Sequence, residues 1–277
     1  MNDILTFLYL PFLAGLILTG IHAYLGVHVV ERGVIFVDLS LAQIAALGST
    51  IAVINGHDIH DTTTYFWSLG FTIVGAAIFA LTRVHRETRI PQEAIIGIVY
   101  AVSAAAAILA MSKATGETEH LKDMLVGNIL SVSTATVIKT AVLYALVGLF
   151  HFIFRKKFLA ISIGSHHGEA EQVKNVKLWD FLFYTSFGFV VTSSVAIAGV
   201  LLVFSYLIVP SVAAMLFSKS IGVRLAIGWT MGAVVSAVGV LLSFQYDLPT
   251  GAAIVCTFGV ALALMAIVWT IKRPNLA

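Results

Sequence analysis

The sequence has little charge. Only 11% of its 277 residues are Asp, Glu, Lys or Arg, whereas a soluble domain carries about 25%. The net charge of +2 is too small to indicate a nucleic-acid partner. The single cysteine, Cys256, excludes an intrachain disulfide and a cysteine metal cluster. Because 59% of the residues are hydrophobic, we predict an all-α integral membrane protein in contact with lipid and with little mass outside the bilayer.

Several chemical motifs are also missing. There is no G-x-x-x-x-G-K-[ST] sequence, so an ATPase that drives transport would have to be another chain. There is no H-E-x-x-H sequence of a metalloprotease. We therefore expect no enzyme activity and no cofactor in this chain. The N-terminus lacks a basic region and an A-x-A cleavage site, and we interpret it as a retained first span.

The sequence does contain long apolar runs, separated by charged or turn-rich breaks. A helix needs about 20 residues to cross a bilayer. One run of forty residues is too long for a single span, so we expect a tight turn near Ala196–Gly199; without it, eight spans result instead of nine. The nine expected spans lie near residues 4–26, 33–54, 65–82, 93–112, 134–154, 179–198, 199–218, 223–243 and 249–271.

Basic residues favour one side of the predicted bundle. Of the 16 Lys and Arg residues, all but Lys113, Lys122 and Lys139 fall in breaks on the same side. The positive-inside rule places that side in the cytoplasm. We thus expect a multi-pass protein of the plasma (inner) membrane, with its N-terminus outside and its C-terminus inside.

The stretch Gly199–Phe217 has one proline, Pro210, followed by small residues. A proline removes one helical hydrogen bond and bends the helix. The freed carbonyl must face protein or a water-filled cavity. The stretch is therefore either a kinked packing helix or part of the wall of a transport pathway.

The second span carries one carboxylate and one side-chain amide. A carboxylate inside a bilayer is a candidate functional group, but Asp38 could also pair with Arg32 near the cytoplasmic end. Gln43 lies among small residues that permit close helix packing. Its amide is either a pathway group or a bridge between two helices.

The expected outer loops carry side chains of the metal-ligand type. His57, Asp58, His60 and Asp61 are either a weak ion-receiving site or a polar turn. The stretch His120–Leu130 has the pattern of a short half-buried helix, which is either a re-entrant element at the mouth of a pathway or an interfacial helix. In the last outer loop, Asp247 is either a metal-pathway candidate or a cap of the last helix.

The only long cytoplasmic segment is Arg155–Lys177, which we interpret as a loop with a short helix from Gly168 to Lys174. Such a loop is either the docking site of a soluble partner or a solvated linker.

Five segments in order resemble the metal-ion (zinc, manganese or iron) permease family of ABC transporters. They are VIFVDLSLAQIAALG, QEAIIGIVYAVSAA, KDMLVGNIL, GVLLVFSYLIVPSVAA and LLSFQYDLPTGAAIV, and the resemblance covers roughly residues 10–265. It implies a fold similar to that of the cobalamin and siderophore permeases, in a single permease domain over residues 1–277. It places pathway or hinge residues at Ser205, Pro210, Pro249 and Gly251.

The resemblance also implies partners. These are a second copy of the chain, a cytoplasmic ATP-binding subunit and an extracytoplasmic solute-binding protein that delivers the metal. The coupling helix for the ATPase maps onto about Ser165–Asn175. Glu169 and Ala170 match the acidic-Ala element of the family, whereas Val173 stands where a glycine is usual.

The second span departs from the family pattern D-x-L-A-H-x-x-x-x-G. Alignment on Gly48 puts Gln43 at the His position and Leu39 at the Asp position. Asp38 is offset by one residue, about 100° around the helix. Either Gln43, Asp38 and backbone carbonyls handle the ion, or the substrate differs.

We therefore expect the membrane subunit of an ABC importer for a divalent transition metal. The alternatives are a permease of the same fold for a non-metal solute and a secondary transporter that needs no ATPase. A secondary transporter requires ionisable groups inside the membrane for coupling, and apart from Asp38 the spans offer almost none.

Overall fold

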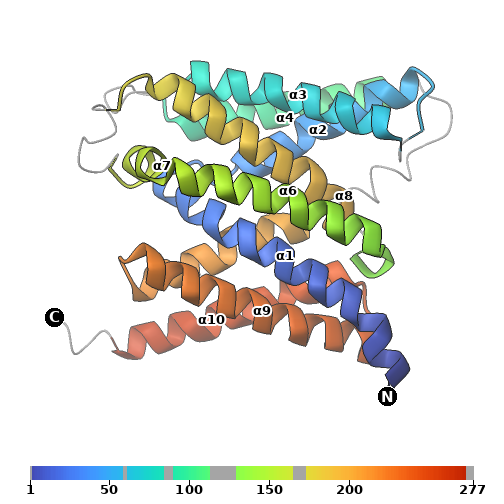
Figure 1. Ribbon diagram of the computed structural model, residues 1–277, viewed down its shortest axis with the longest axis vertical. Helices are drawn as coiled ribbons and strands as arrows, with labels where there is room; N and C mark the ends of the chain where they lie inside the picture. The colour runs from blue at the N-terminus through green and yellow to red at the C-terminus, as the bar shows by residue number, and fades with distance from the viewer. Residues whose placement is uncertain (1, 59–60, 84–89, 113–128, 165–172, 273–277) are drawn as a thin grey trace. The chain divides into compact units, whose positions relative to one another are not determined.

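The computed structural model describes residues 2–58, 61–83, 90–112, 129–164 and 173–272 (Figure 1). Within these ranges the chain forms helices and no β-strand. Eight of these helices are long and apolar enough to cross a membrane, judged by length and composition. The predicted all-α class is confirmed.

Contacts divide the chain into two compact units. The first unit consists of Met1–Val30, Leu125–Ala145 and Ile197–Ala277. The second unit consists of Glu31–Met124 and Leu146–Ala196. Both units are assembled from segments far apart in the sequence, so each depends on tertiary packing rather than on local order.

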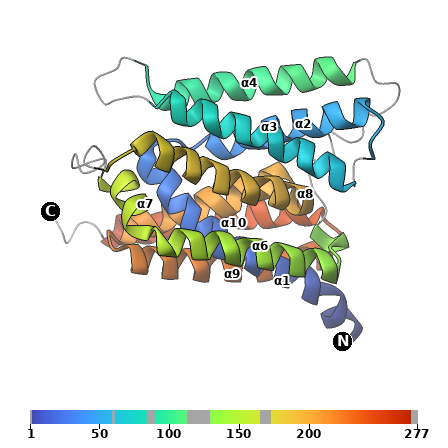
Figure 2. The ribbon, with the colours of Figure 1, turned by 45° about the horizontal axis from the view of Figure 1, so that its top comes forward.

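The second unit contains α2 (Val37–Ile54), α3 (Thr62–Leu81), α4 (Gln92–Met111), α7 (Arg155–Ser162) and the first part of α8 (Val176–Phe217). Helix α2 packs against both α3 and α4 (Figures 1 and 2). The approach of α2 to α3 is close: a Cβ atom added at Gly48 would lie 2.8 Å from the Cα of Ser68. Small residues at such contacts let the helix backbones pack tightly.

The first unit contains α1 (Asn2–Arg32) as far as Val30, η1 (Ile129–Ser131), the start of α6 (Thr134–Ile153), the rest of α8, α9 (Ile221–Tyr246) and α10 (Thr250–Lys272). Helices α9 and α10 pack against each other. Here too a glycine permits the contact, since a Cβ atom at Gly239 would lie 2.7 Å from the Cα of Ile254.

Helix α8 contains the break that the sequence predicted. It is 42 residues long, and at 1.5 Å per residue a straight helix of that length would be about twice as long as the hydrocarbon core is thick. Gly199 has non-helical dihedral angles, φ 74° and ψ 161°, in a region that glycine adopts without strain. The parts before and after Gly199 are each long enough for one span, which agrees with the predicted break.

The segment Arg155–Lys177 differs from the expected loop, because its first eight residues form α7. Phe158 and Ile161 on this helix are buried, and Phe158 stacks on the ring of His151 at 4.3 Å. This apolar face holds the charged RKK run in a helix. Val173 and Lys174 at the end of the predicted short helix are not helical; its other residues, 168–172, lie outside the described ranges.

The predicted helix His120–Leu130 is described only at its end. Residues 120–128 lie outside the described ranges, and Ile129 begins a single turn of 3-10 helix, η1.

Candidate functional site

The proline-bearing part of α8 faces protein. Pro210 is buried, and the Cβ atom of Pro210 would lie 3.6 Å from a Cβ atom added at Gly228 of α9. On α1, a Cβ atom at Gly26 would collide with the carbonyl oxygen of Leu207. One turn after that carbonyl, the hydroxyl of Ser211 donates a hydrogen bond to it at 2.8 Å. These contacts agree with the packing interpretation of this helix, while a hinge role of Pro210 stays a prediction.

The same part of α8 is joined to α9 by a buried polar pair. The hydroxyls of Tyr206 and Ser236 are 2.7 Å apart, and the Tyr206 ring meets Phe258 of α10 edge to face. Ser205 is also buried, and its hydroxyl donates to the carbonyl of Leu201 in its own helix. Thus Ser205 satisfies its polar group within α8.

Asp247 lies in the turn between α9 and α10, and its side chain is exposed. Asp247 ends α9 in the left-handed conformation, with φ 52° and ψ 45°. The hydroxyl of Ser243 lies 2.7 Å from the Leu248 carbonyl oxygen and 2.6 Å from the Thr250 hydroxyl. Asp247 therefore closes α9, and the Ser243 hydroxyl links the end of α9 to the start of α10.

At the start of α10, Pro249 is exposed and Gly251 is buried. A hinge role of these two residues stays a prediction.

Helix α2 carries a buried carboxylate. Asp38 is 1% exposed, and no group in the described ranges bonds its Oδ1 atom or the hydroxyl of Ser40. The predicted pair of Asp38 with Arg32 does not form, because Arg32 bonds Asp180 instead. A buried carboxylate oxygen without a partner is costly, so Asp38 stays the strongest functional candidate in this helix.

The other predicted ion-handling residues of the second unit are spread along α2 and beyond its end. Gln43 is half-buried, His57 is half-buried and Asp58 is exposed. His60 lies outside the described ranges. Over the residues that the structure describes, no group of three or more His, Cys, Asp and Glu side chains could hold a metal ion. The described residues thus form no metal cage.

The predicted coupling residues are described only in part. Ser165, Glu169 and Ala170 lie outside the described ranges. Val173 is half-buried, and Asn175 has a positive φ of 59°. The carbonyl of Asn175 accepts hydrogen bonds from the backbone N–H groups of Leu178 and Trp179. Asn175 therefore fixes the start of α8.

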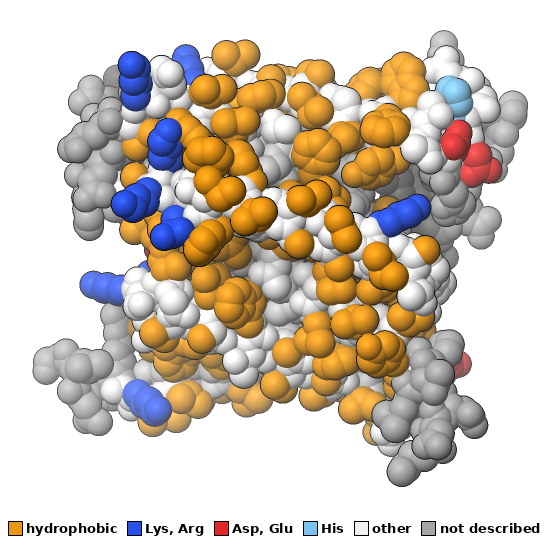
Figure 3. Space-filling model, in the orientation of Figure 1, with side chains coloured by type: hydrophobic (Ala, Val, Ile, Leu, Met, Phe, Trp, Pro, Cys, Tyr) orange, Lys and Arg blue, Asp and Glu red, His pale blue; other side chains and the backbone are white. Residues whose placement is uncertain are grey.

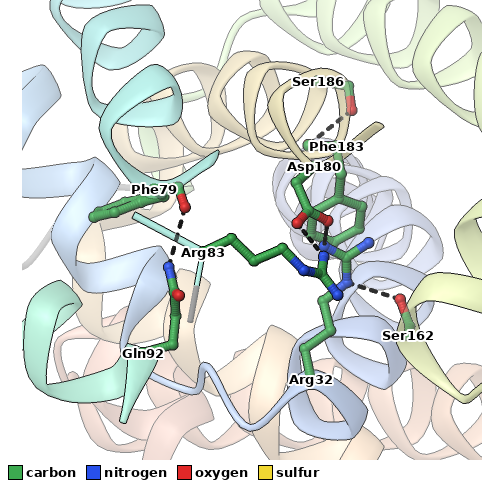
Figure 4. Close-up of polar contacts among 8 residues, drawn as sticks. All are labelled: Arg32, Phe79, Arg83, Gln92, Ser162, Asp180, Phe183 and Ser186. Carbon is green, nitrogen blue, oxygen red and sulfur yellow. Dashed lines mark hydrogen bonds and ion pairs between the residues drawn. The ribbon is translucent and has the colours of Figure 1, made fainter. Parts of the chain in front are cut away.

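An ion cluster near that start was not predicted. Asp180 of α8 accepts hydrogen bonds from Arg32 at one carboxylate oxygen, at 2.8 Å, and from Arg83 at the other (Figure 4). The Nε atom of Arg32 donates to the hydroxyl of Ser162 at the end of α7, at 2.8 Å. The Arg32 guanidinium carbon lies 3.9 Å from the centre of the Phe183 ring. One cluster therefore joins α7, α8, the end of α1 and Arg83, the second residue after the end of α3.

Hydrogen bonds between neighbouring helix ends support this part of the second unit. Gln92 at the start of α4 donates to the Phe79 carbonyl of α3 at 3.1 Å (Figure 4). The N–H of Phe36, just before α2, donates to Glu93 at 2.9 Å. One feature of the sequence could have predicted the cluster. Asp180 lies at the start of a predicted span, on the predicted cytoplasmic side where Arg32 and Arg83 also lie.

Comparison with known proteins identifies the family of this chain. The sequence model of the ABC 3 transport family matches residues 5–270. The chain belongs to the ABC 3 transport family. The chain is 29% identical over 237 residues to two relatives, one from Listeria monocytogenes and one from Listeria innocua. Both relatives are named manganese transport system membrane protein MntC. The aligned region is 82% of this chain and 81% of each relative.

A solved structure shares the fold of the permease. The structure is PsaBC from Streptococcus pneumoniae in complex with Fab, in which one chain superposes with a TM-score of 0.77. The sequence identity is 22%, and the match covers 95% of this chain and 93% of the other. The expected permease fold is confirmed, and the protein is a multi-span membrane component of an ABC transporter.

Proposed function

We propose that this permease is the membrane subunit of an importer for a divalent transition-metal ion, and that manganese is its first candidate. The observation that carries the proposal is the family match along residues 5–270. The two Listeria relatives named for manganese transport support the choice of ion. Zn²⁺ and Fe²⁺ have the same charge as Mn²⁺, so the experiment below compares all three ions.

Energy would come from a separate ATPase. The sequence has no phosphate-binding loop, so the chain would take up the movement of a partner and catalyse nothing itself. The partner would dock between α7 and α8, on the segment that includes Ser165–Asn175. A solute-binding protein would deliver the ion on the other face, and two copies of the chain would surround one path.

Charge supports an orientation in the plasma membrane. On the face drawn in Figure 3, Lys and Arg side chains gather at the end where α7 and the start of α8 lie, and the His and acidic side chains visible on this face lie at the other end. By the positive-inside rule the first end faces the cytoplasm. The N-terminus would then be outside and the C-terminus inside. Exposed apolar residues of α4, such as Ile98 and Leu109, would contact lipid.

The ion would pass along α2. Asp38 supplies a carboxylate and Gln43 an amide oxygen, and both ligand types suit manganese. A permease must also release its ion, which favours weak and successive contacts over a closed cage. The absence of a metal cage from the described residues is compatible with such a path.

The test is uptake by vesicles that contain the permease and its candidate ATPase, with Mn²⁺, Zn²⁺ and Fe²⁺ offered separately. We expect ATP-dependent uptake of one ion, with no uptake when the ATPase is omitted. ATP hydrolysis by a stable complex without metal uptake would contradict the metal assignment and favour a non-metal solute. Uptake without any ATPase would favour a secondary transporter.

Substitutions in α2 test the path. We expect Asp38→Asn, which removes the carboxylate charge, and Gln43→Ala, which removes the amide oxygen, to reduce the uptake rate about tenfold or more, the factor for one charge-assisted contact. Asn55→Ala is the matched control, because Asn55 is exposed at the end of the same helix and its amide donates to the Ile51 carbonyl. Equal uptake by all three variants would remove α2 from the path.

A further inference from the structure

The side chain of Arg32 bonds both helices that flank the segment between α7 and α8. Arg32 donates from Nε to Ser162, the last residue of α7, and from Nη1 to Asp180, in the second turn of α8 (Figure 4). Both donor–acceptor distances are 2.8 Å. The two bonded residues lie immediately before and shortly after the segment 163–175, which is the proposed docking site of the ATPase.

The geometry points to Arg32 as a positioning residue that couples the ATPase to the membrane helices. We propose that Arg32 holds the end of α7 and the second turn of α8 together, so that the movement of a docked ATPase reaches the end of α1 through this side chain. The inference rests on the proposed function, because it takes the segment to be the docking site. Arg32 contacts neither the ion nor the nucleotide in this account and acts through the segment alone.

Burial, a second ion pair and an aromatic ring restrict the movement of the Arg32 side chain. The side chain of Arg32 is 6% exposed and that of Asp180 is 2% exposed, so water is largely excluded from the pair. Arg83 occupies the second carboxylate oxygen of Asp180, which opposes rotation of the carboxylate. Phe183 packs under the guanidinium. A guanidinium is also planar, with its donors in a fixed fork.

Arginine is specifically required by this arrangement. Two donors of one rigid group point at two acceptors on different helices. The ammonium of a lysine carries the same charge but is a single point on a flexible stem. In an Arg32→Lys variant it would pair with Asp180 or reach Ser162, but it would not hold both in the observed geometry.

The experiment compares uptake with hydrolysis in the assembled transporter. The permease and ATPase are reconstituted in vesicles with the solute-binding protein, and metal taken up per ATP hydrolysed is measured for Arg32→Lys and Ser162→Ala. We expect assembly and ATP hydrolysis to persist while uptake per ATP falls about tenfold in Arg32→Lys, the factor for one lost charge-assisted hydrogen bond. Ser162→Ala should fall in the same direction. Arg224→Lys is the control: Arg224 is also buried, and it bonds the Ser218 carbonyl.

Uptake per ATP separates coupling from stability, because a merely unstable variant yields less complex with an unchanged ratio. An unchanged ratio in Arg32→Lys, with or without lower yield, would overturn the inference. An equal fall in Arg224→Lys would overturn it too, since the effect would then follow from any buried arginine. Failure of the proposed function would show in the unsubstituted transporter as no assembly or no metal uptake.

Discussion

The close approach of α2 to α3 gives a stability prediction that can be worked from distances. A Cβ atom at Gly48 would lie 2.8 Å from both the Ser68 Cα and the Trp67 carbonyl oxygen, whereas ordinary contact begins at 3.4 Å. The variant Gly48→Ala must therefore move these atoms by 0.6 Å (3.4 − 2.8). Both belong to the backbone of α3, so no side-chain rotation relieves the clash and the two helices must separate.

The expected cost follows from two opposing effects. Overpacking of this kind costs about 1–3 kcal/mol, and separation of the helices also loosens neighbouring contacts. Alanine returns up to about 1 kcal/mol through its higher helix propensity. We expect a net loss of about 1–2 kcal/mol, which lowers Tm by about 2–8 °C in a protein of this size.

The assay is the thermal stability of the purified permease in detergent, followed by size-exclusion chromatography after heating. Gly70→Ala is the matched control, because Gly70 lies on α3 with no atom within 4 Å of an added Cβ. We expect it to be neutral or slightly stabilising. Equal Tm values for Gly48→Ala and the unsubstituted protein, or an equal loss in Gly70→Ala, would refute the packing argument.

Three further substitutions probe other contacts by the same thermal assay. Asp180→Ala leaves the buried Arg32 without its carboxylate, and breaking a buried ion pair costs about 3–5 kcal/mol; full yield and an unchanged Tm would contradict the cluster. Tyr206→Phe removes the hydroxyl that bonds Ser236 and should cost about 1 kcal/mol, so a Tm equal to that of the unsubstituted protein would count against this bond. Gly199→Ala puts a side chain on a backbone with φ 74° and ψ 161° and should cost about 1–3 kcal/mol. A stabilised Gly199→Ala variant would mean that the helix continues through this position.

The spans were predictable because their physical cause is local. A run of about 20 apolar residues is long enough to cross a bilayer whatever surrounds it, and the described helices begin and end within a few residues of most of the predicted limits. The break in α8 was predictable for the same reason: forty apolar residues exceed one span, and Gly199 offers the dihedral angles that the break requires. Helix α7 was missed because its apolar face is short and its first residues are charged.

The candidate site was only partly predictable. The sequence identified Asp38 as the main intramembrane carboxylate, and the structure shows that it is buried and that its Oδ1 atom has no partner in the described ranges. Proximity in the sequence suggested the wrong partner for Arg32. Gly33, with φ 67°, ends α1 before α2 begins, and Arg32 meets Asp180 of α8 instead. Ion pairs between helices depend on which helix ends lie together, and the sequence does not contain that information.

The sequence by itself determined the membrane class, most limits of the spans and the resemblance to a permease family, and it predicted a break near Ala196–Gly199. These features follow from the length and hydropathy of local runs and from motifs along the chain. Tertiary structure alone decided which side chains meet. Gly48 and Gly70 look alike in the sequence, but one lies against the backbone of α3 and the other has open space around it. Arg32 became a link between α7 and α8 only because packing brought residues 130 and 148 positions away to a single guanidinium.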